Sequence, residues 1–373
     1  GNRGCSVALW RDDRDVTDAD SMTPGRSGAR SRIEMPDTIV RPAVPGVLLK
    51  ARPVGAQLAD RLADPVPDGM ELYVHESDVA GEPGDDRWRE LLHGHVTSVA
   101  PLVPPGFRWI VEGPVWALDG ALFGLGGNRA IDRLLVERLV TIATDIGAWA
   151  VNIHAVDGTD DPTVINPGAR VRAIDRALPF LAWYTRSCRD AGLVPLVENV
   201  PPICRMRREA YVFTPYGVEP GDMRALVAAV PGLRVTLDLS HAQLAVNALR
   251  GDLPEPGAPP AVRMAADAYR RRGAATGTLT LDDFIQVLID DVDNVHVANA
   301  SGLLDEGAPY DRGDANLDSA IRRLAPVVTS FVTEPLDPDE SHGVEKRRMQ
   351  ASLHACLGTR PGDARTAVGA VAR

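Results

Sequence analysis

The sequence is poor in features that define several specialised protein classes. It has four cysteines in 373 residues, with no CxxC pair among Cys5, Cys188, Cys204 and Cys356. A dense disulfide framework is therefore excluded, and a reducing, cytoplasmic location fits best. No apolar run approaches the ~20 residues that a membrane-spanning helix needs. The first residues show no basic segment followed by an apolar core, so we expect neither a membrane span nor a signal peptide.

Basic residues are also in the minority. Forty Lys and Arg stand against 51 Asp and Glu, which gives a formal net charge of −11. Such a balance disfavours nucleic acid and anionic membranes as general partners, because both need a positive surface. We therefore expect a small-molecule substrate. The oligomeric state stays open, a homo-oligomer included.

The chain has enough apolar residues for one large core, at 45% of the sequence. Residues 1–43 are polar and lack apolar periodicity, so they predict a disordered N-terminal extension. Residues 359–373 predict a flexible tail. Between them, residues 44–358 alternate strand-like and helix-like patterns, which is typical of an α/β fold with parallel strands. The strand candidates are Val47–Ala51, Met70–Val74, Arg108–Val111, Ala148–Ile153, Pro195–Val197, Arg234–Leu237, Val292–Val297 and Ser330–Thr333. Eight such strands predict a (β/α)8 TIM barrel, which commonly takes ~250 residues.

Helical patterns separate most of these strands. Asn128 is expected to cap a helix with an apolar stripe that runs from Ile131 to Ile142. Further helices are predicted at 171–189, 223–230, 261–272, 281–289, 317–324 and 343–357. The Pro- and Gly-rich segment 252–260 is expected to be a loop insertion, because the alternation resumes after it.

The most informative pattern is a metal-ligand side chain at the end of each of the last four strands. These residues are Glu198, Asp238, His296 and Glu334. In a TIM barrel the functional groups sit at the carboxyl ends of the strands. A buried charge is costly without a partner or a metal. The four residues together therefore predict one divalent-metal centre, and their oxygen and imidazole ligands suit Mn, Mg, Co, Fe or Zn.

This ring of ligands indicates a type of reaction. A divalent ion that binds two oxygens of a polyol or hydroxy-ketone stabilises an enediolate as negative charge develops. Glu198 and Glu334 are then the catalytic pair that exchanges protons with carbon. Isomerisation or epimerisation of a small sugar, polyol or hydroxy-ketone follows most directly.

Other polar residues near the same strand ends are candidates for binding substrate. His241 follows Asp238 by three residues, and His154 ends the fourth strand. Glu112 ends the third strand. Asn199 follows Glu198 and, by strand alternation, is expected to face the opposite way unless the strand has ended. It is a candidate either to orient a loop or to bind substrate.

The chain resembles the xylose isomerase-like TIM barrel superfamily, particularly its sugar phosphate isomerase/epimerase branch. The resemblance covers residues 46–357 and rests on Val197-Glu198-Asn199, Asp238-Leu239-Ser240-His241, His296-Val297-Ala298-Asn299 and Thr333-Glu334-Pro335. It implies that Glu198, Asp238, His296 and Glu334 bind one metal ion. It also implies that the two glutamates act as acid and base and that the histidine at 241 contacts the substrate.

The chain departs from this resemblance at two places. Cys204 stands where a second glutamate is usual. Arg312 is the one candidate, and a distant one, for a substrate-binding arginine after the strand-seven histidine.

Other functions stay open at this point. Endonuclease IV is a more distant relative, but the Asp-x-His pair that it implies is missing from 305–314, and Glu112 stands at a position implied to be histidine. A two-metal, iron-dependent oxidase that uses His154 and His241 is another alternative. A cyclic-polyol dehydratase would need the same enediolate. A non-catalytic binding barrel would not need all four ligands.

Overall fold

The computed structural model describes residues 44–82, 84–206, 210–277 and 279–365. The N-terminal extension predicted at 1–43 lies outside the described residues. Among the described residues, no helix is long and apolar enough to cross a membrane.

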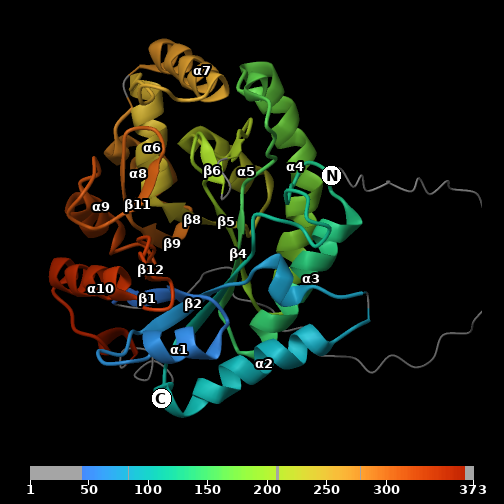
Figure 1. The fold of residues 1–373 in the computed structure, drawn as a ribbon, viewed down its shortest axis with the longest axis vertical. Helices are drawn as coiled ribbons and strands as arrows, with labels where there is room; N and C mark the ends of the chain where they lie inside the picture. Colours follow the sequence, from blue (N-terminus) through green and yellow to red (C-terminus); the bar gives the residue numbers. More distant parts are fainter. Residues whose placement is uncertain (1–43, 83, 207–209, 278, 366–373) are drawn as a thin grey trace, which may run out of the picture. The chain divides into compact units, whose positions relative to one another are not determined.

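Eight parallel strands close into a barrel, which confirms the predicted fold class (Figure 1). Around the barrel they stand in the order β1-β12-β9-β8-β5-β4-β3-β2. Their bounds are β1 Gly46–Ala51, β2 Gly69–Tyr73, β3 Arg108–Glu112, β4 Ala150–His154, β5 Val194–Glu198, β8 Arg234–Asp238, β9 Val292–Val297 and β12 Ser330–Thr333. Each strand candidate from the sequence corresponds to one of these strands, within two residues at either end.

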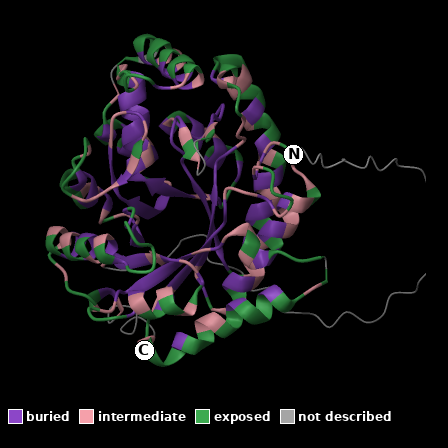
Figure 2. Ribbon diagram, in the orientation of Figure 1, coloured by how far each residue is buried: buried purple, intermediate pink, exposed green. Residues whose placement is uncertain are grey.

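The strands are buried on both faces, as their continuous apolar runs predict (Figure 2). Their outer face packs against the helices in the main hydrophobic core, which includes Val47, Val151 and Val295. A second, smaller cluster fills the barrel interior. It consists of Leu48, Ile110, Ala150, Val194, Leu196 and Val332. This plug lies one inward-facing position before Lys50, Glu112 and Glu198 along their strands.

Helices surround the strands (Figure 1). They are α1 Gly55–Arg61, α2 Arg87–Val99, α3 Ala130–Asp145, α4 Pro167–Asp190, α5 Pro220–Ala229, α6 Leu239–Arg250, α7 Pro260–Thr276, α8 Leu281–Leu288, α9 Leu317–Leu324 and α10 Val344–Leu357. Three short 3₁₀ turns cover Glu76–Val79, Ala100–Leu102 and Pro162–Val164.

The helices differ from the sequence prediction at the N-cap of α3 and in α1, α2 and α6, none of which was predicted. Asn128 is not the cap of α3: it has a positive φ of 47°, and Arg129 holds the N-cap position. Asn128 instead accepts a hydrogen bond from the Arg133 side chain at 3.0 Å. Helix α6 was not predicted and follows β8 without a loop, because the Asp238 side chain caps it directly.

Two antiparallel hairpins extend the loops that follow strands. Strands β6 Cys204–Met206 and β7 Ala210–Val212 pair after β5, and β10 Asn299–Ser301 and β11 Asp305–Ala308 pair after β9. Both hairpins follow carboxyl ends of barrel strands. They therefore stand on the side where a TIM barrel carries its functional loops.

The tail predicted at 359–373 is described only as far as Arg365. In this part Ala364 is buried, and the Gly362 N–H donates to Asp68 Oδ1 at 2.8 Å. The described part therefore packs against the barrel, and the flexibility of the tail stays a prediction. Residues 366–373 lie outside the described residues.

Candidate metal centre

A ring of chemically active side chains lines the barrel above its apolar plug. Side chains alternate between the two faces of a strand, so a residue two positions beyond an interior residue also faces inward. Leu48, Ile110 and Leu196 lie in the plug, and two positions further along stand Lys50, Glu112 and Glu198. Glu334 follows Val332 by the same step, and His154 stands two such steps after Ala150. Tyr73, Asp238 and His296 lie within one residue of the ends of the remaining strands. Each barrel strand thus supplies to the ring one side chain within one residue of its carboxyl end.

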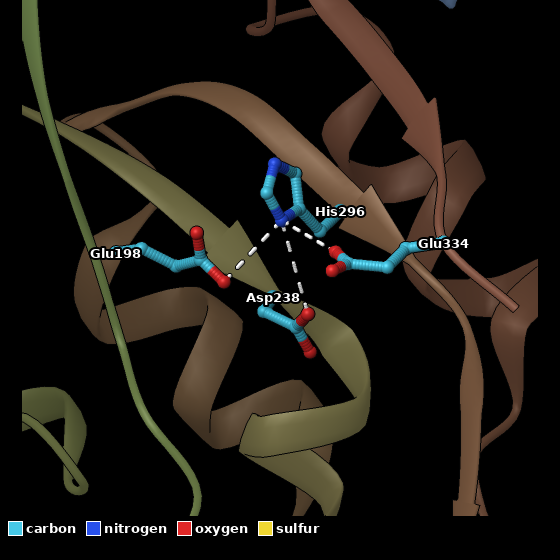
Figure 3. Close-up of side chains that lie close together, drawn as sticks. All are labelled: Glu198, Asp238, His296 and Glu334. Carbon is cyan, nitrogen blue, oxygen red and sulfur yellow. Dashed lines mark ion pairs between the residues drawn. The ribbon is translucent and has the colours of Figure 1, made fainter. Parts of the chain in front are cut away.

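Four members of the ring lie close enough to share one ion. Glu198, Asp238, His296 and Glu334 each offer a ligand atom, and these atoms all lie within 4.8 Å of one another. Figure 3 shows the four side chains pointing toward a common centre. His296 Nδ1 is 2.6 Å from Glu334 Oε2 and 3.3 Å from Glu198 Oε1. It is 3.9 Å from Asp238 Oδ2.

The remaining oxygen of two of these ligands is held by a hydrogen-bond donor. Glu198 Oε2 accepts from Asn152 Nδ2 at 2.6 Å, which leaves Oε1 for the centre. Asp238 Oδ1 accepts from the His241 backbone N–H at 2.6 Å, the capping bond of α6. Its other oxygen, Oδ2, faces His296. Each carboxylate is therefore fixed with one free oxygen directed inward.

The other two ligands are held by charged partners. His296 Nε2 lies 2.8 Å from Glu71 Oε1, which favours a proton on Nε2 and a lone pair on Nδ1. Glu334 Oε1 is paired with the Lys50 ammonium, while Oε2 faces His296. Metal-bound histidines commonly have a carboxylate beside their second ring nitrogen, because this fixes the ring and raises its basicity.

These contacts fit a divalent cation. Glu198 Oε1, His296 Nδ1 and Glu334 Oε2 are buried and make no hydrogen bond among the described residues. Burial raises the pKa of Asp238 to about 7, against the opposing effect of His241. A divalent ion would remove this penalty, because it favours ionised carboxylates and unprotonated imidazole. The donor set of three oxygens and one nitrogen suits Mg²⁺, Mn²⁺ or Zn²⁺.

Three of the residues expected to bind substrate stand beside this cluster. His154 Nε2 lies 3.4 Å from Glu112 Oε1 and 3.8 Å from Glu198 Oε2. His241 Nδ1 lies 3.6 Å from Glu198 Oε1, and its Nε2 lies 3.6 Å from Glu306 of β11. Burial lowers the pKa of His154, so the neutral imidazole is the favoured form there.

Two further residues predicted to bind substrate have other neighbours. Both polar groups of the Asn199 side chain bond the backbone of Asp238, which donates to Oδ1 at 2.8 Å and accepts from Nδ2 at 3.1 Å. Asn199 is fully buried and joins β5 to β8, while its role in substrate binding stays a prediction. Arg312 is exposed and lines a hollow with Glu345 and Arg348 of α10. It makes no contact with the cluster among the described residues.

Four polar residues around the centre were missed. Lys50, Glu71 and Asn152 lie on interior positions of β1, β2 and β4, and Glu306 lies on a rim hairpin. Alternation could have revealed Lys50, because it is a lone charge two residues after Leu48 in an apolar strand. It could also have revealed Asn152, two residues before His154. No such signal marks Glu306.

Comparison with solved structures identifies the architecture. An L-ribulose 3-epimerase structure superposes with a TM-score of 0.53, at 12% identity over 88% of this chain and 98% of that chain. A xylose isomerase domain protein from Planctomyces limnophilus superposes with a TM-score of 0.54, at 11% identity over 84% of this chain and 98% of that chain. A 3-keto-D-glucoside 4-epimerase from E. coli superposes with a TM-score of 0.51, at 12% identity over 84% of this chain and 99% of that chain.

The chain has the fold of the xylose isomerase-like TIM barrels. No protein-family model matches the sequence, and no curated protein does either. At 11 and 12% identity the likeness shows this fold alone.

Proposed function

We propose that the protein is a divalent-metal-dependent isomerase or epimerase of a small sugar, polyol or hydroxy-ketone. The observation that carries this proposal is the arrangement of the four candidate ligands. Each candidate ligand directs one polar atom inward, while a specific neighbour contacts its second polar atom. This holds for Glu198, Asp238, His296 and Glu334. Such preorganisation is what a metal centre requires.

The bound ion would act as a Lewis acid that polarises a carbonyl and stabilises the developing enediolate. Glu198 and Glu334 would move the proton. Glu198 ends β5, and Glu334 directly follows β12. Strands β8 and β9 stand between β5 and β12 in the barrel, so the two carboxylates can reach a bound substrate from two directions. The Asn152 amide orients Glu198, and the Lys50 ammonium orients Glu334.

The rim residues would complete the substrate site. His154 and His241 lie beside the inward-facing carboxylates and can donate to or accept from substrate hydroxyls. Glu306 contacts His241 from the β10–β11 hairpin, so this loop would also shape the pocket. The names of the solved L-ribulose 3-epimerase and 3-keto-D-glucoside 4-epimerase describe sugar substrates and are consistent with this class.

The hydrolytic alternative has less support from these residues. Endonuclease IV-like chemistry would need further imidazole ligands from the loop after the seventh barrel strand. In this chain that loop forms β10 and β11 and places Glu306 beside His241. The net charge of −11 also lacks the basic surface that DNA binding favours.

Exchange of carbon-bound hydrogen tests the reaction type before the substrate is known. The Mn²⁺-loaded protein would be incubated with a panel of ketoses and inososes in deuterated water and followed by NMR. We expect deuterium to enter the carbon next to the carbonyl of at least one compound. No exchange with any compound, together with cleavage of abasic DNA, would overturn the proposal in favour of the nuclease.

A further inference from the structure

Lys50 is a cation placed inside a ring of potential metal ligands. It projects from β1 and is nearly buried, with 12% of its side chain exposed. Its Nζ lies 2.6 Å from Glu112 Oε2, pairs with Glu334 Oε1 and is 4.0 Å from Glu71 Oε1. The ammonium also lies over the Tyr73 ring, 5.1 Å from its centroid.

The carboxylates around Lys50 belong to two further groups that could hold an ion. Glu71, Glu112 and His296 form one of them, and Glu112, His154 and Glu198 form the other. In each group the ligand atoms lie within 4.8 Å of one another. Glu112 is common to both, so an ion in either group would use a Glu112 oxygen.

Both groups also overlap with the candidate metal centre. His296 belongs to one of them and Glu198 to the other, and both are ligands of the main cluster. Two metal ions that share a ligand lie ~3.5–4 Å apart in two-metal enzymes. The barrel therefore contains the side chains for a second ion beside the first.

Lys50 opposes such a second ion. Its ammonium lies at hydrogen-bonding distance from Glu112, and a divalent cation bound to the same carboxylate would meet it at short range. Both Glu112 and Glu71 are buried, so little water screens this repulsion. The contact with Glu334 also ties the ammonium to a ligand of the main centre.

We propose that Lys50 is a positioning residue that takes the second cation position and limits the barrel to one divalent ion. This inference rests on the proposed function, because it assumes that Glu198, Asp238, His296 and Glu334 bind the first ion. The positive charge at residue 50 would then distinguish a one-metal proton-transfer site from a two-metal site built on the same ring. The ammonium neutralises Glu112 and keeps Glu334 Oε1 occupied.

The test measures metal stoichiometry rather than activity. Mn²⁺ would be titrated into the full-length protein, with bound ions counted by equilibrium dialysis and their coupling followed by electron paramagnetic resonance. The wild type is expected to bind one ion with an uncoupled spectrum. Lys50→Met, which keeps a long unbranched side chain and removes the charge, is expected to bind two ions with exchange coupling.

Two control variants separate charge from packing. Lys50→Arg keeps the positive charge and is expected to bind one ion. Lys50→Met combined with Glu112→Gln removes the ligand that both further groups share, so it is expected to return to one ion.

The failures of the two proposals are distinguishable. If the wild type binds one ion and Lys50→Met also binds one, the role of Lys50 is wrong and the metal centre stands. If the wild type binds no ion, the metal centre and the inference both fall. Wild-type protein that takes up two coupled ions would overturn the role of Lys50 even if Lys50→Met does not fold.

Discussion

The orientation of each candidate ligand depends on a contact made by its second polar atom. Asn152 holds Glu198, the α6 backbone holds Asp238, Glu71 contacts His296 and Lys50 holds Glu334. The ligands are thus positioned by neighbours on other strands as well as by their own backbone.

The two glutamates should be indispensable for proton transfer. Glu198→Gln and Glu334→Gln keep the shape of each side chain but remove its basicity. We expect each to lower the rate of deuterium exchange by about 10²–10⁴-fold. Glu90→Gln, on the exposed face of α2, is the control and should exchange at the wild-type rate. Normal exchange in Glu334→Gln would show that this residue is not part of the acid/base pair.

Asn199 should matter for stability rather than for substrate affinity. Its side chain bonds both the N–H and the C=O of buried Asp238, so Asn199→Ala removes two buried hydrogen bonds. We expect the free energy of unfolding to fall by about 1–3 kcal/mol, as measured by urea denaturation. A stable variant that has lost only substrate affinity would support the substrate-binding role predicted from sequence.

The residues that end strands were predictable because a buried charge in an apolar strand is conspicuous. Glu198, Asp238, His296 and Glu334 all carry this signal. The role of Asn199 was not predictable, since its partner is the backbone of Asp238, 39 positions away. Contacts between strands that are distant in sequence leave no local pattern.

At the scale of elements, the junction between β8 and α6 connects the fold to the site. Asp238 ends the strand, caps the helix through Oδ1 and presents Oδ2 to the centre. Helix α7 then packs against α6 at Gly273, where a Cβ would lie 1.8 Å from the Leu249 carbonyl oxygen. This crossing supports the helix whose first turn positions Asp238 and His241.

Gly273→Ala should therefore be destabilising although alanine is the better helix former. We expect a loss of about 1–3 kcal/mol from forced separation of the two helices, measured by chemical denaturation. Gly94→Ala in α2 is the matched control. It meets no atom within 4 Å and should gain about 0.5–1 kcal/mol from helix propensity. Equal changes in the free energy of unfolding for the two variants would contradict the close packing of α7 against α6.

The element pattern was predictable where periodicity was strong. The eight strands followed from their β-branched apolar runs, whereas α6 was missed because its first turn, Leu239-Ser240-His241, adjoins the strand without a break. The two hairpins are only three or four residues per strand, which is too short for a periodic signal.

For the whole molecule, the ring concentrates negative charge in a buried space. Glu71, Glu112, Glu198 and Asp238 are all buried, and Glu334 stands beside them with 26% of its side chain exposed. Buried carboxylates without compensating charge are costly, so the barrel should be more stable with its cation than without it.

Metal binding should therefore raise the stability of the protein. At a Mn²⁺ concentration 100 times the Kd, binding adds about 2.7 kcal/mol to the free energy of unfolding. Addition of a chelator should reverse the accompanying rise in Tm, as measured by calorimetry. Asp238→Asn keeps an oxygen for the α6 cap but weakens the ligand, so it should show a much smaller shift. A rise in Tm as large as that of the wild type in Asp238→Asn would show that the ion binds elsewhere.

The central claim is that Glu198, Asp238, His296 and Glu334 bind one divalent ion. Anomalous diffraction from crystals of the full-length protein soaked in Mn²⁺ tests it most directly. We predict a single anomalous peak about 2.0–2.3 Å from Glu198 Oε1, Asp238 Oδ2, His296 Nδ1 and Glu334 Oε2. A peak between Glu112, His154 and Glu198 instead, or none within the ring, would contradict it.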